Sequence, residues 1–141
     1  MRIKTLLLTV LSCALLCAVC GGSEKKAVIK SNENGDVALT QPTQVGTLTL
    51  PPGTYAVKEH VSSGQHYIRF MRVKESRELR VSRAFTGWYT DRQLSKAGEV
   101  KSRVQPLGAK AQETTVTVTT EDGTQHISQL TIRGKKTLYV F

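Results

Sequence analysis

The chain has 141 residues, and its three cysteines all lie within the first twenty. If those twenty residues are removed on export, the remaining 121 contain no thiol, which excludes disulfides, thiol catalysis and thiolate metal sites. Twenty basic residues against eleven acidic ones give a formal net charge of +9, a balance that favours anionic partners. The length fits a single domain with its own core.

Residues 1–20 have the layout of a secretory signal peptide. A cationic start at Arg2 and Lys4 precedes an apolar stretch, Leu6–Val19, and small residues follow from Gly21. The apolar stretch is shorter than the roughly twenty residues that cross a bilayer. We therefore predict cleavage before Gly21, export to the periplasm or outside the cell, and no stable membrane span. Retention as an anchor and lipidation of a cysteine stay open as alternatives.

Residues 21–36 are small, polar and charged, whereas residues 37–141 carry the strand patterns of a single β domain. The first segment predicts a flexible polar lead-in with at most one short strand at its centre. In the second, Leu48–Leu50 and Tyr55–Val57 have strand-like patterns on either side of Pro51–Gly53. Because Pro-Pro-Gly is typical of a type II turn, we expect these two strands to pair antiparallel.

The middle of the chain predicts further strands. Val61–Gly64 is a turn signal, and His66–Lys74 follows it as a strand. Adjacent Phe70 and Met71 indicate that this strand is covered on both faces or contains a bulge. Apolar residues then alternate with polar ones at Leu79, Val81 and Phe85.

One segment has a helical signature. Thr90 precedes Gln93 with capping-box spacing, and Gly98 suits a helix end, so at most one short helix is expected near residues 91–97. Later strands are expected at 100–104, 114–120, 126–132 and 137–141, with a turn at Asp122-Gly123. The pattern predicts an all-β fold, a small antiparallel sandwich or barrel of about seven strands.

Two segments are similar to a known kind of protein. Leu50–Val57 (LPPGTYAV) resembles the LPAGTYxV element of short exported proteins abundant in Acidobacteria and related soil bacteria. Asp122–Lys136 resembles the DG(T/S)…L.EI.F.GKK ending of the same proteins. The two segments bracket most of the chain that follows the signal peptide. The resemblance implies export and a small β-sandwich-like fold without an established activity, and it carries over no functional residue.

Metal and catalytic sites find little support in the residue spacing. The three histidines lack the HxH or HExxH spacing of zinc sites: His60, His66 and His126. Asp91 would need a second carboxylate for glycosidase chemistry, and nothing in the spacing selects Glu99 or Glu113 for that role. We therefore expect no catalytic residue, no metal, no cofactor and no enzymatic activity.

The best candidate for a binding surface is the basic stretch with the aromatic residues that follow it. The predicted ligand-binding residues are Arg69, Arg72, Arg77, Arg80, Arg83, Trp88, Tyr89, Asp91 and Arg92. Exposed aromatic side chains with charged neighbours can stack on a sugar or anchor a protein. Two other interpretations stay open: the single tryptophan can belong to the core, and the arginines can form a solvated strand face.

These features predict an exported, non-catalytic β domain that binds an anionic or polar partner at the cell envelope or outside the cell. Its partner would be an anionic glycan, a lipid head group or an acidic protein, and export argues against nucleic acid. An inhibitor of an extracellular hydrolase is the alternative, with a protruding loop such as 85–98 entering the target's cleft. A small secreted hydrolase is the second alternative. The oligomeric state stays open.

Overall fold

A computed structural model describes residues 24–141, so the predicted signal peptide and all three cysteines lie outside the described residues. The described chain contains ten strands and no helix, and therefore no helix that could cross a membrane. The strands are β1 Lys25–Lys30, β2 Asp36–Leu39, β3 Thr43–Val45, β4 Leu48–Leu50, β5 Gly53–Ser62, β6 Gln65–Val81, β7 Thr86–Pro106, β8 Thr115–Glu121, β9 Thr124–Thr131 and β10 Thr137–Val140. The predicted all-β class is confirmed, with ten strands where about seven were expected.

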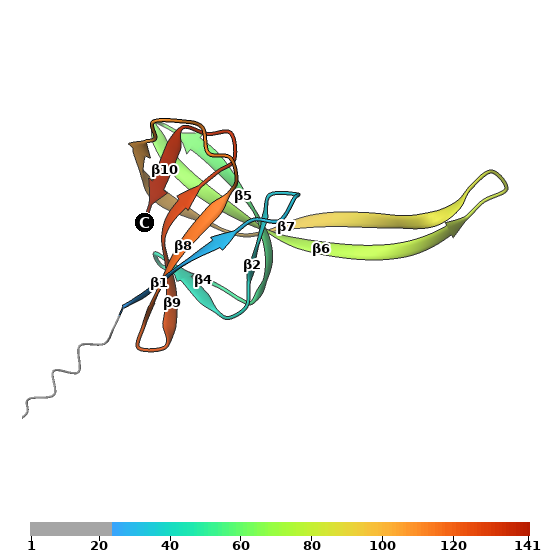
Figure 1. Ribbon diagram of the computed structural model, residues 1–141, viewed down its shortest axis with the longest axis horizontal. Helices are drawn as coiled ribbons and strands as arrows, with labels where there is room; N and C mark the ends of the chain where they lie inside the picture. The colour runs from blue at the N-terminus through green and yellow to red at the C-terminus, as the bar shows by residue number, and fades with distance from the viewer. Residues whose placement is uncertain (1–23) are drawn as a thin grey trace, which may run out of the picture.

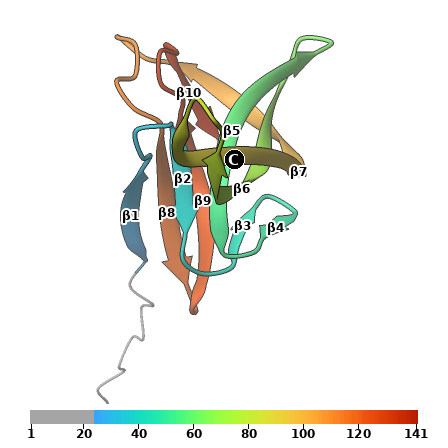
Figure 2. The same cartoon turned by 90° about the vertical axis from the view of Figure 1, so that its right-hand side faces the viewer.

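The strands form one open sheet in the order β1-β8-β9-β10-β7-β6-β5-β2. Strand β3 adds to β9 in parallel, and β4 pairs with β3. The end of β7 pairs with β10, while the rest of β7 pairs with β6, so β7 links the two halves of the sheet. Figure 2 looks along β6 and β7 at the body, with β1 and β8 on one side and the β3–β4 hairpin on the other. The sheet does not close into a barrel, and the arrangement is sandwich-like.

The core lies between the two halves of this sheet. Its buried members are Val37, Leu39, Val45, Leu50, Tyr55, Ile68, Phe70, Val116, Val118, Ile127, Leu130 and Tyr139. The β-branched segment β8 shows how the sequence produces this core, because Val116 and Val118 are buried while Thr117 between them faces outward. Tyr55 is also buried, and its hydroxyl donates a hydrogen bond to the Pro51 carbonyl at 2.6 Å.

Two tight turns lie where the sequence predicts them. Ser63 and Gly64 join β5 to β6, and Asp122 and Gly123 join β8 to β9. All four residues have positive φ, between 49° and 77°. This backbone conformation is that of the two-residue turns that match the twist of antiparallel hairpins.

The turn expected at Pro51–Gly53 does not form a hairpin. Strand β4 pairs with β3, whereas β5 pairs with β2 and β6. Proline has no N–H to donate to a strand ladder, so Pro51 and Pro52 interrupt pairing instead of turning it back. The chain uses these residues to cross between two parts of the sheet, and the expected pairing is wrong.

The short helix allowed near residues 91–97 is also absent. This segment is the middle of β7, paired residue by residue with β6 from Arg92 opposite Glu75 to Lys96 opposite Met71. Leu94 is its main apolar residue, so a helix here would have no apolar face to bury. Pairing with β6 supplies hydrogen-bond partners for the backbone N–H and C=O groups of this segment instead.

The irregularity expected at Phe70 and Met71 is confirmed as a bulge. Phe70 lies opposite Gly98 and Met71 opposite Lys96, so one extra residue of β7 is inserted. Leu48 lies against Gly98, where a Cβ atom would be 2.5 Å from its Cδ2 atom. At the other end of the sheet, Lys25–Lys30 forms β1 inside the segment expected to be a lead-in and pairs in register with β8.

Candidate functional site: the β6–β7 arm

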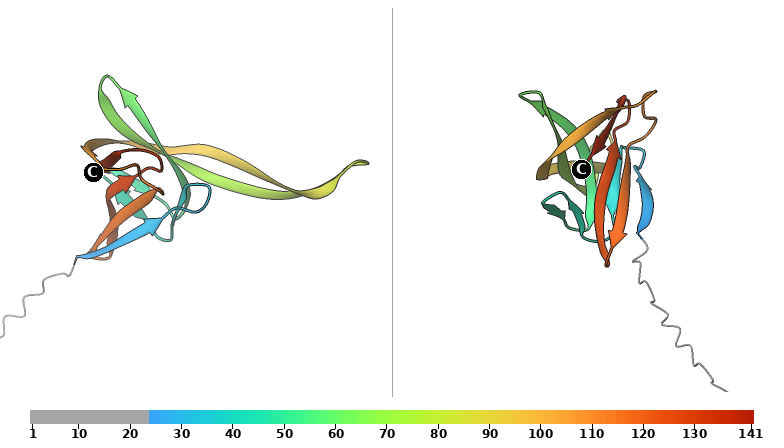
Figure 3. Two further views of the ribbon diagram at one scale, coloured as in Figure 1. Left: turned by 45° about the horizontal axis from the view of Figure 1, so that its top comes forward. Right: turned by 90° about the vertical axis from the view of Figure 1, so that its left-hand side faces the viewer.

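Residues 73–94 form a two-stranded ribbon that projects from the body, and we call this ribbon the arm. From Val73 onward β6 pairs only with β7, because its pairing with β5 ends at Arg72. Figures 1 and 3 show the arm extending well beyond all the other strands. Nine residues in each strand give a length of about 30 Å. Every residue from 74 to 97 is exposed except Gly87, which is partly buried. Beyond its root, therefore, the arm does not pack against the body.

The outer end of the arm, residues 77–90, is its tip. Val81 pairs with Thr86, and the loop between them is closed by backbone hydrogen bonds between Ser82 and Phe85. The hydroxyl of Ser82 adds two contacts with the Phe85 backbone, both at 3.1 Å. The tip therefore has a defined conformation that can present its side chains in fixed positions.

One face of the tip carries Trp88. Leu79 lies directly opposite Trp88 on the neighbouring strand, and Val81 lies on the same face one pair further out. Trp88 is 63% exposed. The Arg77 guanidinium lies 5.5 Å from the centre of its ring, a cation–π arrangement. Trp88 is thus not a core residue, which excludes one of the two interpretations that the sequence left open for it.

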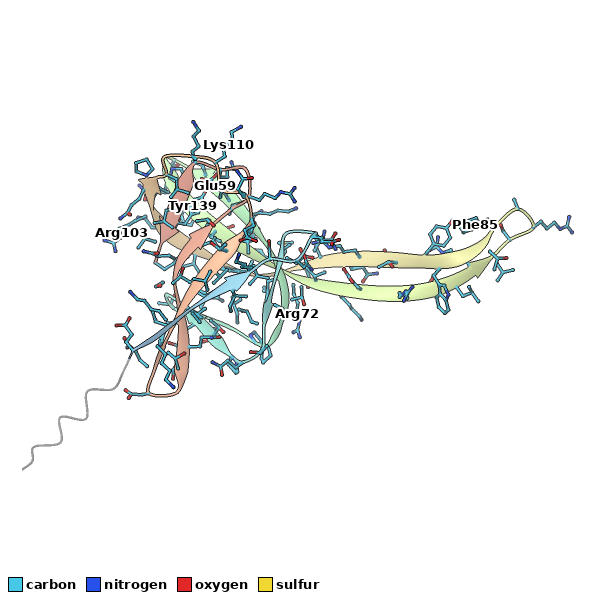
Figure 4. The ribbon with its side chains drawn as sticks, in the orientation of Figure 1. Glu59, Arg72, Phe85, Arg103, Lys110 and Tyr139 are labelled. Carbon is cyan, nitrogen blue, oxygen red and sulfur yellow. The ribbon has the colours of Figure 1, made fainter. Side chains whose placement is uncertain are left out.

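The other face of the tip carries Tyr89 and Phe85. Their rings meet edge to face with centroids 5.6 Å apart. The Arg80 guanidinium lies 5.0 Å from the Tyr89 ring centre, which repeats the arrangement of the first face. Phe85 lies over Gly87, where a Cβ atom would approach its ring to 2.5 Å. Figure 4 shows Phe85 near the outer end of the arm.

The root of the arm is fixed to the body by two arginines. Arg92 forms an ion pair with the buried carboxylate of Asp36 on β2. Arg72 donates a hydrogen bond of 3.4 Å to the Pro52 carbonyl, and Figure 4 shows it where the arm meets the body. A small surface pocket beside this junction is lined by Asn32, Thr54, Val73 and Glu75. These contacts set the direction in which the arm projects.

The structure brings together five of the nine predicted site residues at the tip: Arg77, Arg80, Arg83, Trp88 and Tyr89. The other four lie elsewhere. Arg69 is on the body, paired with Glu99 at 2.7 Å. Asp91 accepts a hydrogen bond from Gln93 on the shaft of the arm, the part between its root and its tip. Arg72 and Arg92 belong to the root, where they hold the arm in place.

Sequence reasoning missed two apolar members of the tip and the residue that anchors its root. Leu79 and Val81 were expected to be ordinary alternating strand residues, yet they are 52% and 71% exposed. Asp36 was not singled out from the sequence, and in the structure its side chain is only 1% exposed. A signal for Leu79 and Val81 existed in the sequence, because they lie among the arginines Arg77, Arg80 and Arg83.

A second group of polar residues lies on the body around Glu59. Its carboxylate contacts His66 Nδ1 at 2.7 Å and Lys135 Nζ at 3.0 Å. Burial acts to raise the pKa of Glu59, but its contacts with His66, Lys135 and Tyr139 outweigh that and hold the pKa below its usual value. Burial and the neighbouring Glu59 raise the pKa of the Tyr139 hydroxyl far above its usual range. Figure 4 shows Glu59 and Tyr139 close together in the body.

This group is an ion-pair network with no second carboxylate or metal-ligand set. His60 and His66 do not face each other, because His60 pairs with Tyr67 and His66 with Val61. Among residues 24–141 no three potential ligands gather to hold a metal. The carboxylates considered for catalysis have separate partners: Glu99 pairs with Arg69 and Glu113 with Lys30.

The arm is therefore the candidate functional site. Its tip combines exposed aromatic rings, aliphatic side chains and arginines on both faces of a narrow ribbon. The arrangement is suited to binding. No protein-family model, curated protein or solved structure matches the chain.

Proposed function

We propose that this protein is an exported, non-catalytic binding protein that engages an anionic or polar partner through the tip of its arm, at the cell envelope or outside the cell. The observation that carries this proposal is the exposure of Trp88, Phe85 and Tyr89 on a ribbon that the body leaves uncovered. Contiguous apolar groups on a protein surface mark interaction sites, because leaving them in water forgoes the free energy of their burial.

The charge of the tip indicates the kind of partner. Three arginines lie in residues 77–90 against one acidic residue, Glu78, so the tip has a net charge of +2. Two of these arginines, Arg77 and Arg80, lie against aromatic rings. A guanidinium held in this way keeps N–H donors available for carboxylate, phosphate or sulfate groups. The partner is expected to combine negative charge with surface that aromatic rings can contact.

The experiment that tests the proposal measures binding at low and at high salt. Protein beginning at Gly21 is suitable, since the whole core cluster lies between Val37 and Tyr139. The panel holds anionic glycans, anionic lipid vesicles and acidic proteins. The tip variant is Arg77→Gln/Arg80→Gln/Arg83→Gln, and the matched control on the body is Lys101→Gln/Arg103→Gln/Lys110→Gln, with the same change in charge at exposed positions.

Salt-sensitive binding that the tip variant loses and the body control keeps is the expected result, because exposed charge pairs are screened within about 10 Å at 0.1 M salt. Equal loss in both variants would mean that net charge alone is responsible, and it would remove the arm from the proposal.

Inhibition of an extracellular hydrolase is a second candidate, favoured by the shape of the arm. A ribbon about 30 Å long with an aromatic tip can enter a cleft that a flat surface cannot. This function predicts binding that persists at high salt and is lost on Trp88→Ala, because it would depend mainly on burial of the indole ring. Salt dependence therefore separates the two candidates.

A further inference from the structure

Apolar groups cover both faces of the tip, and this limits what can bind it. Trp88, Leu79 and Val81 lie on one face, while Phe85 and Tyr89 lie on the other. A flat protein or glycan surface would cover one face and leave the other in water. A surface that surrounds the ribbon would cover both. The interfacial region of a lipid bilayer does so without needing a shape complementary to the ribbon.

The side chains of the tip match the chemistry of that interfacial region. Tryptophan and tyrosine concentrate at the head-group level of membranes, where their rings meet apolar chains and their polar atoms meet water. Arg77 and Arg80 lie beside the rings, so their guanidinium groups can reach head-group phosphates while their alkyl chains stay among apolar atoms. Arg83 adds a third cation in the loop at the outer end.

The backbone of the arm limits how deep it can go. A two-stranded ribbon has two open edges, and the N–H and C=O groups along them need water or polar head groups as partners. Hydrocarbon offers none, so an open sheet edge is not stable in the membrane interior. Insertion therefore stops at the head groups, which is also where the arginines find phosphate.

The distribution of acidic residues favours an anionic bilayer. Glu75 and Asp91 lie on the root side of the tip, and the one acidic residue within it, Glu78, has Arg80 at 3.8 Å. Each Lys or Arg near an anionic leaflet contributes favourably to membrane binding, whereas a neutral leaflet gives no such attraction. The tip thus carries its cations outward, toward the surface it would meet.

From these observations we infer that the partner is an anionic lipid bilayer and that the arm tip enters its head-group region, with Trp88, Tyr89 and Phe85 among the lipids and Arg77, Arg80 and Arg83 on the phosphates. The inference rests on the proposed function and names its partner. A two-sided cleft in another protein is the competing occupant, and the test below separates the two.

The chain provides its own probe, because Trp88 is its only tryptophan and lies on the tip. Protein from Gly21 is mixed with vesicles of phosphatidylcholine alone, or of about equal parts phosphatidylcholine and phosphatidylglycerol. With the anionic vesicles, the emission of Trp88 should move to shorter wavelength and be quenched by lipids brominated near the head-group end of their chains. With phosphatidylcholine alone both effects should be weak.

Variants separate insertion from general attraction. Replacing Arg77, Arg80 and Arg83 with glutamine should lower partitioning to anionic vesicles roughly a hundredfold, from the contribution of each cation near such a surface. The body control, with the same charge removed at Lys101, Arg103 and Lys110, should lower it less than about tenfold because those residues are not brought to the phosphates. Phe85→Ser should lower it about tenfold while leaving every charge in place.

Three results would overturn the lipid inference. If the protein sediments with anionic vesicles but Trp88 emission is unchanged and unquenched, the body binds and the tip does not insert. If vesicles are not bound while an acidic protein or glycan is bound through the arginines of the tip, the partner is not lipid and the proposed function stands. Failure to bind any member of the panel would remove both proposals. Circular dichroism of each variant shows that the fold is intact.

Discussion

The ion pair between Arg92 and Asp36 joins the arm to the body, so removing it tests how the arm is held. The side chain of Asp36 is 1% exposed and that of Arg92 is 36% exposed. The Asp36 Oδ1 atom faces Arg92, and Oδ2 has no hydrogen-bond partner within the described chain. Arg92→Gln therefore leaves a buried carboxylate without its cation.

Loss of one partner from a buried ion pair costs about 3–5 kcal/mol, mostly because the remaining charge is left uncompensated. Arg92 is more than a third exposed, so water already screens part of this pair. We expect Arg92→Gln to lower the free energy of unfolding by about 2–3 kcal/mol, which is less than for a fully buried pair. Asp36→Asn removes the charge but keeps the shape and the backbone N–H that donates to the Asn32 side chain.

The assay is urea denaturation followed by far-ultraviolet circular dichroism, because Trp88 fluorescence reports on the arm and not on the core. The stability lost by the double variant Asp36→Asn/Arg92→Gln should be smaller than the sum of the losses of the two single variants by about 1–2 kcal/mol, as expected for residues in direct contact. Arg83→Gln, an exposed control on the same ribbon, should change stability by less than about 0.5 kcal/mol. A loss below that value for Arg92→Gln, or full additivity of the two changes, would refute the reasoning.

Three other changes probe the packing, the network around Glu59 and the tip. Gly98→Ala should cost about 1–3 kcal/mol in urea denaturation, because its Cβ would lie 2.5 Å from Leu48 Cδ2; unchanged stability would mean that Leu48 moves aside freely. Glu59→Gln should flatten the acid side of the stability curve. Because the contacts of Glu59 lower its folded-state pKa below its unfolded value, its carboxylate stabilises the fold above the unfolded pKa and loses that contribution as pH falls through the folded-state pKa. The thermal melts of the two proteins should therefore converge at acidic pH, once the pH is below the folded-state pKa. Trp88→Ala should alter the free energy of unfolding by less than about 0.5 kcal/mol because the side chain is 63% exposed, and a loss above about 1.5 kcal/mol would give Trp88 a structural role.

Features set by neighbouring residues could be predicted from the sequence. The turns at Ser63-Gly64 and Asp122-Gly123 depend on residues that tolerate positive φ next to alternating strands, and both formed. The bulge beside Phe70 was visible as two adjacent apolar residues in a strand. In each case the information lies within a few positions of the chain, where spacing and residue type suffice.

Features set by distant partners could not be predicted in this way. The capping-box spacing of Thr90 and Gln93 is a local helix signal, but pairing with β6 decided the outcome. Strand β5 likewise pairs with β2 and β6, not with the β4 strand just before it. Sequence spacing does not show which distant strand a segment will pair with. Backbone pairing and packing with that strand outweigh weak local preferences for helix or turn.

The exposure of Leu79 and Val81 was missed for a related reason, yet the sequence does contain a sign of it. Alternation at Leu79, Val81 and Phe85 resembles the alternation of a buried strand, because a period of two describes any sheet face whatever covers it. What differs is the stretch that separates these residues from the core. Between Val73 and Leu79 strand β6 carries only charged or polar side chains, over a distance of about 20 Å. Apolar residues beyond such a polar shaft cannot reach their own core, so they remain available to a partner outside the molecule.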